Sequence, residues 1–433
     1  MKKEVEIEER KPYGSGYKWV IVALCFLTVM ICLGFCSSPR SLFVGPMSEA
    51  LGVDRSVYSF NDSLRYITTA VTNLFFGFLI VKFGEKKLML MGILSLIGSS
   101  LCYVFANGVV LLYLGGILLG FGFSFTTTTM VGYVIDKWSR NNKGTIMGLV
   151  LAANGIGGAI AIQIVSPIIE SNREIPGYKL AYIVVAVILS VLAAVIALFF
   201  RRKKESDSEK EDNSGKSKKR GRSWIGIELS DARKKWYFYA ILAIMFFTGL
   251  SLQGISGIAP QHMKDVGMDP DTVKSVMSLG SLALALFKFG AGFAYDRLGL
   301  RTTVSVCTAA SVLAMISLIA VNATSVGTAV VYMILIHVAL PLETVMIPIY
   351  SSDLFGDKSY GRILGLFVSM NTAGFAIGAP LTNLCYDLTG SYKTGFYIGI
   401  VIMLCVTVCL QFVISAANKT RKKVCAEISD GQK

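Results

Sequence analysis

The chain alternates long apolar segments with short stretches that are rich in charged residues, glycine or proline. An α-helix needs about 20 apolar residues to cross the ~30 Å hydrocarbon core of a bilayer, and the apolar segments reach this length. The pattern predicts twelve membrane-spanning helices, at residues 19–46, 57–81, 87–107, 109–135, 145–169, 179–200, 235–262, 271–298, 302–321, 326–352, 361–387 and 392–416. We therefore expect an all-α integral membrane protein that contacts the lipid bilayer.

The composition leads to the same interpretation. Of 433 residues, 53% are hydrophobic and 16% are charged, which is too apolar for a water-soluble enzyme of this length. The sequence contains no paired aspartates, HExxH motif or nucleophile–base spacing, so we expect no enzyme activity. The cysteines lie mostly inside apolar segments and lack metal-binding spacing, so we expect no disulfide, no metal and no cofactor.

Lysine and arginine outnumber aspartate and glutamate by 42 to 28. The excess lies in short runs between apolar segments and not on one basic face, so we expect no nucleic-acid partner. Basic loops stay on the cytosolic side of a membrane. This rule places the N-terminal tail, 1–18, and the C-terminal tail, 417–433, in the cytosol and the protein in the cell membrane.

The chain consists of two related halves. A charged cytosolic linker at 201–234 separates one six-helix bundle, 19–200, from a second, 235–416. The tract GFLIVKFGEK, which begins at Gly77, recurs as GFAYDRLGLR from Gly292. At a constant offset, Asp136, Gly144, Gly148 and Asn154 recur as Asp353, Gly361, Gly365 and Asn371. A six-helix unit has thus been duplicated in parallel, and solute sites in such folds lie at mid-membrane between the halves.

The repeated tract resembles the loop signature between helices 2 and 3 of the major facilitator superfamily. The residues that carry the resemblance are Gly77, Gly84 and Lys86 in the first copy and Asp296, Arg297, Gly299 and Arg301 in the second. The resemblance implies a major facilitator fold and a loop that controls conformational change. The first copy has Val81 where the family has an acidic residue, so we expect the loop carboxylate to act in the second half.

Within the superfamily, the chain is similar to the monocarboxylate transporter and oxalate/formate antiporter group. Pro39-Arg40-Ser41 matches a Pro-Lys-Ser tract of that group, and Lys288 stands in the place of its substrate-binding arginine. The resemblance implies a small organic anion bound between Arg40 and Lys288. An arginine does not release its proton, and Leu284 replaces an aspartate of the monocarboxylate carriers. The resemblance therefore supports an anion substrate more than it supports proton coupling.

Ionisable residues inside the predicted helices are few, and each costs about 2.5–3.5 kcal/mol to insert unless it is paired or hydrated. Away from the helix ends they are Arg40, Asp62, Arg65, Lys288, His337 and Glu343. If all six share one cavity and His337 is neutral, three cations face two carboxylates. A bound monoanion would then balance the charge.

Several candidates for proton coupling have a second interpretation. Glu343 is either a proton-coupling site beside Lys288 or half of a permanent ion pair. Asp62 and Arg65, at i and i+3, either take part in coupling or form a local ion pair near the outer mouth. His337 is either a further proton carrier or a core imidazole.

Three uncharged residues complete the candidate substrate site. Asn154 and Asn371 either bind the ligand or hydrogen-bond the opposite half. Thr126 either binds the ligand or donates to its own helix.

From these observations we expect a secondary active transporter that moves a monocarboxylate or short dicarboxylate by alternating access. Proton symport and exchange against a counter-anion are both compatible with the residues. A carrier for a neutral solute or a drug exporter is the alternative, and a transporter-like sensor is a further one. We expect the protein to be a monomer.

Overall fold

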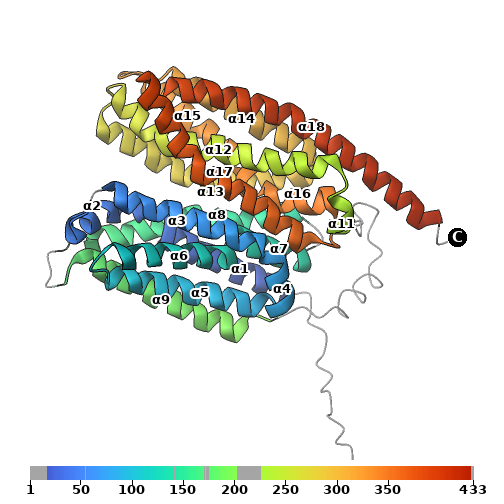
Figure 1. Cartoon of the computed structure of the whole chain (residues 1–433), viewed down its shortest axis with the longest axis horizontal. Coiled ribbons are helices and arrows are strands. Elements are labelled where there is room, and N and C mark those ends of the chain that lie inside the picture. The colour runs from blue at the N-terminus through green and yellow to red at the C-terminus, as the bar shows by residue number, and fades with distance from the viewer. Residues whose placement is uncertain are drawn as a thin grey trace, which may run out of the picture.

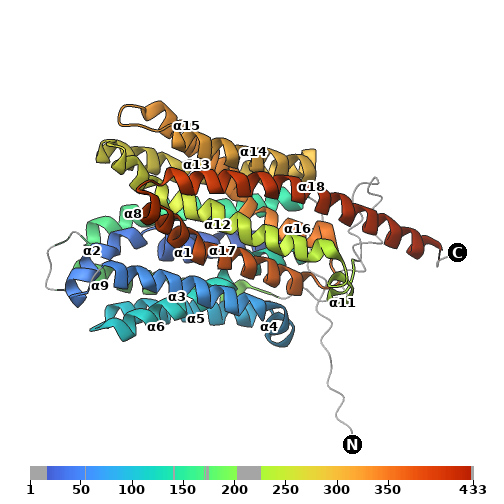
Figure 2. The ribbon, with the colours of Figure 1, turned by 45° about the horizontal axis from the view of Figure 1, so that its top comes forward.

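The computed structural model describes residues 17–53, 55–139, 142–169, 171, 175–201 and 226–430. All regular secondary structure among these residues is helical. Residues 1–16 of the predicted N-terminal tail and residues 202–225 of the predicted linker lie outside the described residues. Figures 1 and 2 show two groups of long, roughly parallel helices, one from each half of the chain.

The described part of the N-terminal half contains nine helical segments. These are α1 (Tyr17–Ser37), α2 (Arg40–Leu51), α3 (Arg55–Leu74), α4 (Phe76–Phe83), α5 (Glu85–Val104), α6 (Val109–Thr126), α7 (Thr128–Trp138), α8 (Lys143–Ile169) and α9 (Gly177–Phe199).

The short helix α11, which falls within the predicted linker 201–234, precedes the C-terminal bundle and lies at one end of it (Figure 1). The segments of the C-terminal half are α11 (Leu229–Ala232), α12 (Trp236–Asp265), α13 (Pro270–Leu298), α14 (Leu300–Ile319), α15 (Val326–Ala339), the 3-10 turn η1 (Leu340–Glu343), α16 (Met346–Phe355), α17 (Tyr360–Thr389) and α18 (Lys393–Asp430).

Four segments that the pattern predicts as continuous helices are interrupted. The helix expected at 19–46 ends at Ser37 and restarts at Arg40, because Pro39 disfavours helical backbone in the residue before it. The helix expected at 57–81 bends by 63° between α3 and α4. The helix expected at 109–135 breaks at Thr127, whose φ and ψ are −118° and −146°. Near Pro341, the helix expected at 326–352 tightens into η1.

The predicted membrane architecture is confirmed. Ten helices in the described part of the chain are long and apolar enough to cross a membrane, and the bent pair α3–α4 makes an eleventh. The helix α13 has 29 residues and is as long as these helices, although it carries more charged residues than most of them do. It lies among them in the C-terminal bundle (Figure 2). Counting α13, the two halves supply the twelve membrane-crossing units. The last of them, α18, continues beyond the predicted end at residue 416 to Asp430.

Close helix packing depends on glycine at several crossings. A Cβ on Gly157 of α8 would lie 2.0 Å from the carbonyl oxygen of Met30 in α1. A Cβ on Gly120 of α6 would lie 2.4 Å from the carbonyl oxygen of Arg65 in α3. Small residues that let backbones approach in this way are typical of membrane helices.

Candidate substrate site and the contact between the halves

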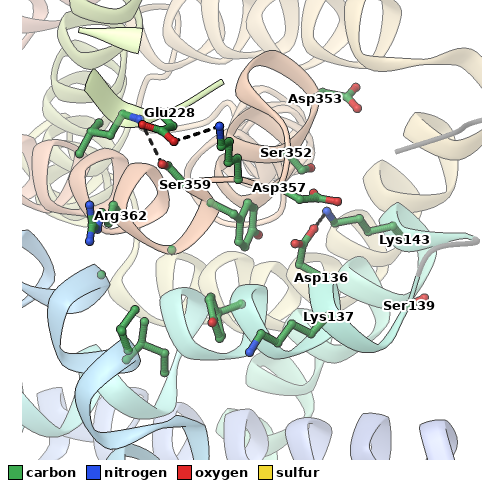
Figure 3. A pocket seen from close by; sticks show the side chains of 18 of the residues that line it. Asp136, Lys137, Ser139, Lys143, Glu228, Ser352, Asp353, Asp357, Ser359 and Arg362 are labelled. Carbon is green, nitrogen blue, oxygen red and sulfur yellow. Dashed lines mark hydrogen bonds and ion pairs between the residues drawn. The ribbon is translucent and has the colours of Figure 1, made fainter. Parts of the chain in front are cut away.

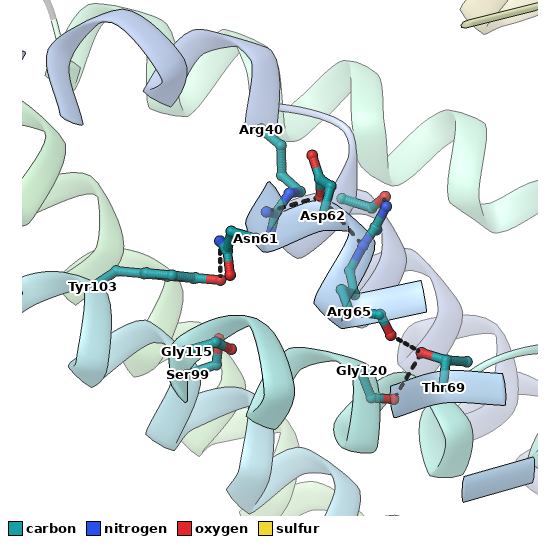
Figure 4. A network of polar contacts seen from close by, with 10 residues as sticks. Arg40, Asn61, Asp62, Arg65, Thr69, Ser99, Tyr103, Gly115 and Gly120 are labelled. Atoms are coloured by element: carbon teal, nitrogen blue, oxygen red, sulfur yellow. Dashed lines mark hydrogen bonds and ion pairs between the residues drawn. The ribbon is translucent and has the colours of Figure 1, made fainter. Parts of the chain in front are cut away.

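Arg40 is the first residue of α2, and its side chain points toward α3 (Figure 4). This side chain is 10% exposed, and its Nη2 atom lies 2.9 Å from Oδ1 of Asp62. Nε of Arg65 lies 3.3 Å from the same oxygen. One carboxylate therefore faces two guanidinium groups, and the Arg40 cluster, which we define as Arg40, Asp62 and Arg65, has a surplus of one positive charge.

The Arg40 cluster is accessible on the side of Asp62. The Asp62 side chain is 37% exposed, whereas that of Arg65 is 8% exposed. The Arg65 guanidinium lies 4.2 Å from the ring centre of Tyr66, and its Nη1 donates to Ser37 Oγ at 3.4 Å. Parallel guanidinium donors match the two oxygens of a carboxylate, so the cluster can bind a carboxylate ligand beside or in place of Asp62.

The C-terminal half supplies a second group of charges. Lys288 in α13 and Glu343 at the end of η1 are each 4% exposed, and they interact electrostatically. Glu343 Oε1 is buried and has no hydrogen-bond partner among the described residues. Burying a charged oxygen without a hydrogen-bond partner is costly. Binding a proton would remove this cost at Glu343, and binding an anion would balance the charge of Lys288.

The other predicted residues have mixed environments. The Thr126 hydroxyl donates to the Gly122 carbonyl of its own helix at 2.9 Å. Asn371 Nδ2 donates to the Met245 carbonyl in α12 at 3.1 Å, a contact within the C-terminal half.

His337 has a hydrogen-bond contact in its own helix, whereas the side-chain oxygen of Asn154 has none among the described residues. His337 Nδ1 lies 2.7 Å from the Met333 carbonyl one turn earlier. Oδ1 of Asn154 is buried without a hydrogen-bond partner in the described part of the chain. Of the uncharged candidates Asn154, Asn371 and Thr126, Asn154 thus has a side-chain oxygen that is buried and without a partner among the described residues.

Lys288 lies where the two halves pack against each other. A Cβ on Gly148 of α8 would lie 2.6 Å from the Lys288 carbonyl oxygen, so α13 and α8 are in close contact there. The Arg40 cluster lies within the helices of the N-terminal half. The structure therefore brings Arg40, Asp62 and Arg65 into one group and Lys288 and Glu343 into another.

A polar cavity of about 870 Å³ lies between the halves at the end that carries α11. Figure 3 shows charged side chains from both halves around it, among them Asp136, Lys143, Asp353, Asp357 and Arg362. Lys143 and Asp136 are in contact as an ion pair. Neither Arg40 nor Lys288 lines this cavity.

Asp296, at the edge of this cavity, binds the start of α8 in the opposite half. Its Oδ1 accepts from the Gly144 backbone N–H at 3.0 Å. Its Oδ2 accepts from the Thr145 N–H at 2.7 Å and from the Thr145 hydroxyl at 2.6 Å. A carboxylate at a helix N-terminus satisfies free amide donors and complements the helix dipole. We call this contact the Asp296 clamp.

The first copy of the loop makes different contacts. Val81, which corresponds to Asp296, is 71% exposed. Glu85 is buried and accepts from Lys137 Nζ at 2.6 Å within the same half. A Cβ on Gly77 would lie 2.5 Å from Cα of Arg362 in α17, so here the halves meet by packing.

The remaining loop residues have local contacts. Gly84 and Gly299 have φ of 76° and 82°, a conformation that favours glycine. Lys86 Nζ donates to the Ala197 carbonyl at 2.6 Å. Arg301 Nε donates to Gln411 Oε1 at 2.6 Å, and the Arg297 guanidinium lies 4.4 Å from the Phe293 ring centre.

Two further hydrogen bonds between the halves involve residues that sequence analysis missed. The Tyr360 hydroxyl donates to the Gly132 carbonyl at 3.2 Å, and the Ser369 hydroxyl donates to the Ala70 carbonyl at 2.6 Å. Thr145, the partner of Asp296, was also missed. The recurrence of Gly144 as Gly361 indicated equivalent positions at the starts of α8 and α17. It did not indicate which residues of the opposite half these helices contact.

Comparisons with known proteins agree with this fold. The family profile described as Major Facilitator Superfamily matches residues 24–252 and, again, residues 241–427. Among solved structures, the proton:xylose symporter XylE bound to 6-bromo-6-deoxy-D-glucose is similar with a TM-score of 0.73 and 13% identity, over 93% of this chain and 97% of that one. At this identity the likeness concerns the fold.

The chain also has relatives among curated proteins. It is 23% identical to the MFS-type transporter YcxA of Bacillus subtilis (strain 168), over 92% of each chain. It is 23% identical to the oxalate:formate antiporter of Oxalobacter formigenes, over 94% of each chain. It is 22% identical to monocarboxylate transporter 12 of Rattus norvegicus, over 98% of this chain and 91% of that one. The predicted resemblance to these two groups is thereby confirmed.

Proposed function

Because the chain belongs to the major facilitator superfamily, it is a membrane transporter and not an enzyme, and we propose that it carries a small organic anion by secondary active transport. The substrate class is a monocarboxylate or short dicarboxylate. The observation that carries this proposal is the Arg40 cluster, in which one accessible carboxylate faces two guanidinium groups. An anion of matching charge neutralises the surplus.

Lys288 is the second anion-binding group of the proposal. It is buried at the contact between the halves, close to Glu343. A substrate carboxylate bound by Arg40 on one half and by Lys288 on the other would draw the two halves together. Two relatives whose names state the substrate class, an oxalate:formate antiporter and a monocarboxylate transporter, support this choice of ligand.

Alternating access follows from breaking and remaking the contact between the halves. The Asp296 clamp and the Tyr360–Gly132 hydrogen bond join the halves at the end that carries α11. In the proposed cycle these bonds release when the opposite end closes over the substrate. A ligand changes this equilibrium by the difference between its affinities for the two states, and two cations on opposite halves supply that difference.

The proposal also assigns an orientation. The bundles at 19–200 and 235–416 cross the cell membrane, while the tails 1–18 and 417–433 and the linker 201–234 lie in the cytosol. The end at which the Asp296 clamp joins the halves is then the cytosolic one. The protein acts as a monomer in this scheme.

Two coupling modes fit the charges. Exchange needs only the cations, because one anion replaces another. Symport needs a group that binds and releases a proton, and Glu343, with Oε1 buried and unpartnered among the described residues, is the first candidate. Asp62 and His337 are the others, and Arg65 would act by modulating Asp62.

Counterflow in proteoliposomes tests the substrate class. Purified protein is reconstituted with internal unlabelled anion, and uptake of labelled formate, lactate, pyruvate and oxalate is followed with and without a pH gradient. We expect uptake of at least one carboxylate, a more than tenfold lower rate in Arg40→Gln and Lys288→Gln, and near wild-type rates in Lys393→Gln. Lys393 is an exposed lysine at the start of α18 and serves as the matched control.

The outcomes separate the alternatives. Uptake that still requires internal anion when an inward pH gradient is imposed indicates exchange, and acceleration by external acid that disappears in Glu343→Gln indicates symport through Glu343. Absence of carboxylate uptake, together with transport of a neutral sugar or an apolar drug, would replace the proposal with the alternative carrier. Specific binding without any flux would indicate a sensor.

A further inference from the structure

The Arg65 guanidinium lies within reach of two aromatic rings. Its Cζ atom is 4.2 Å from the ring centre of Tyr66, the next residue of α3, and 5.6 Å from that of Phe123 in α6. The Arg65 side chain is 8% exposed, and Phe123 is buried. Aromatic rings attract a cation over their faces, and more strongly where water is excluded. The two rings therefore stabilise the Arg65 guanidinium in its observed position.

In this position the donors of Arg65 point toward the accessible side of the Arg40 cluster. An arginine that packs on a ring can still use the N–H groups at the edge of its guanidinium. Nε of Arg65 faces Oδ1 of Asp62 at 3.3 Å (Figure 4), and Nη1 donates to Ser37 Oγ at 3.4 Å. Because Asp62 is the accessible member of the cluster, Tyr66 supports Arg65 on the side where the proposed anion would bind.

Tyr66 also lies on the side of α3 that meets the opposite half. Asp62, Tyr66 and Ala70 are spaced at i, i+4 and i+8 and so follow one another along one side of the helix. The Ala70 carbonyl accepts from Ser369 Oγ of α17 at 2.6 Å. The Tyr66 ring meets Phe375 of α17 edge to face, with 5.9 Å between the ring centres. One turn of α3 thus leads from Asp62 to a contact with the C-terminal half.

We propose that Tyr66 is a positioning residue for transport, which couples the orientation of Arg65 to the contact between the halves. This role rests on the proposed function, which assigns Arg65 to the anion site. When the halves rock, Phe375 moves relative to Tyr66, and the ring that supports Arg65 moves with it. The Arg40 cluster then holds an anion more tightly in one conformation than in the other, and alternating access requires such a difference in affinity.

Counterflow with full-length protein in proteoliposomes tests this role. It is measured with labelled formate, lactate, pyruvate or oxalate, whichever the wild-type protein takes up fastest. Tyr66→Leu removes the ring, and we expect KM to rise about 2- to 30-fold, the range that a cation–π contact supplies, while the maximal rate changes less. Tyr66→Phe keeps the ring and should restore the wild-type KM. Phe60→Leu removes an exposed ring from the same helix and is the matched control, with unchanged KM.

A double variant tests the contact with the opposite half. Phe375→Leu removes the ring that Tyr66 meets, and we expect it to raise KM by a smaller factor than Tyr66→Leu does. If Phe375 acts through Tyr66, the double variant should have the KM of Tyr66→Leu alone. Factors that multiply in the double variant would mean independent effects and would overturn the coupling. A wild-type KM in Phe375→Leu would overturn it as well, so the test does not depend on the folding of Tyr66→Leu.

A measurement without any carboxylate separates this role from the proposed function. Phenylglyoxal modifies accessible guanidinium groups, and mass spectrometry of the peptide that contains Arg65 gives its rate of modification. We expect Arg65 to react severalfold faster in Tyr66→Leu than in the wild type and in Tyr66→Phe. If it does and the wild type transports no carboxylate, the substrate assignment is refuted and the positioning of Arg65 by Tyr66 stands. If carboxylate flux is present and neither the modification rate nor KM responds to Tyr66→Leu, only the positioning role is refuted.

Discussion

The two copies of the glycine-rich loop lie in equivalent places and both pack a glycine against the opposite half, but the second copy adds a charged contact. In the second copy, Asp296 reaches across to the first amides of α8 and makes three hydrogen bonds with Gly144 and Thr145. In the first copy, Val81 is exposed, and Gly77 packs against the backbone of Arg362 at the start of α17.

The supporting helices differ as well. The helix that precedes the second loop, α13, is continuous over 29 residues. Its counterpart is divided into α3 and α4, which meet at 63°. Duplication thus preserved a glycine crossing in both loops, with Gly77 against Arg362 and Gly292 against Gly144, and the second loop carries an electrostatic contact through Asp296 in addition. We infer that the Asp296 clamp is the contact whose strength depends on charge, and that the Gly77 contact depends on shape.

The largest expected effect comes from filling the glycine crossings. A Cβ on Gly292 would lie 2.0 Å from the carbonyl oxygen of Gly144. This oxygen is a backbone atom, so it cannot move aside without moving α8. Overpacking costs about 1–3 kcal/mol and sometimes more. Gly292→Val should therefore reduce counterflow more than tenfold at unchanged levels of folded protein.

Gly77→Val is the matched variant in the first copy. Its nearest neighbour is Cγ of the Arg362 side chain at 2.4 Å, which can move, although Cα at 2.5 Å cannot move without the backbone. We expect a smaller, severalfold loss of counterflow. Equal losses in both variants would show that the two crossings are equally rigid and would remove this part of the comparison.

The sequence predicted the fold well because membrane spans follow from the length of apolar segments, and the duplication is visible in the loop tracts. The helix breaks were not predicted where the local residues give no signal. Phe75, at the bend between α3 and α4, sits in an apolar run, and Thr127 sits within four consecutive threonines. Pro39 did give a signal, and it is this break that positions Arg40 at the start of α2.

The candidate site was predictable where it depends on local spacing. Asp62 and Arg65 pair at i and i+3, a spacing that places two side chains next to each other on one helix face. The partners of Asp296 lie 151 and 152 residues away in the chain, and they depend on how two bundles dock. Thr145 therefore could not be found from periodicity.

A smaller effect is expected from removing the charge of the clamp. Asp296→Ala deletes the acceptors for Gly144 and Thr145, and loss of an N-terminal helix cap costs about 0.5–2 kcal/mol. The amides of these two residues should exchange with deuterium about 2- to 30-fold faster, because they open locally. Hydrogen exchange read by mass spectrometry on the peptide that contains the start of α8 measures this.

Glu85→Gln is the control for the clamp. Glu85 is the first-copy residue that pairs within its own half, with Lys137, so its substitution should leave exchange at Gly144 and Thr145 unchanged. Unaltered exchange in Asp296→Ala would show that the clamp does not hold the start of α8.

The smallest effect is expected from restoring the missing acid in the first copy. Val81 and the start of α17 border the same cavity, and the amide of Gly361 corresponds to that of Gly144, which Asp296 binds. Val81→Asp should place a carboxylate near this helix N-terminus and near Arg362.

A charge in this position contributes about 0.3–1 kcal/mol at an exposed site. Exchange at Gly361 should therefore slow about two- to fivefold at low salt and less at high salt, whereas Val81→Asn, which has the same shape without the charge, should slow it less. If the aspartate and asparagine variants behave alike, the two loops differ in geometry and not merely in one side chain, and the bend between α3 and α4 becomes the better explanation of why the first copy carries no clamp.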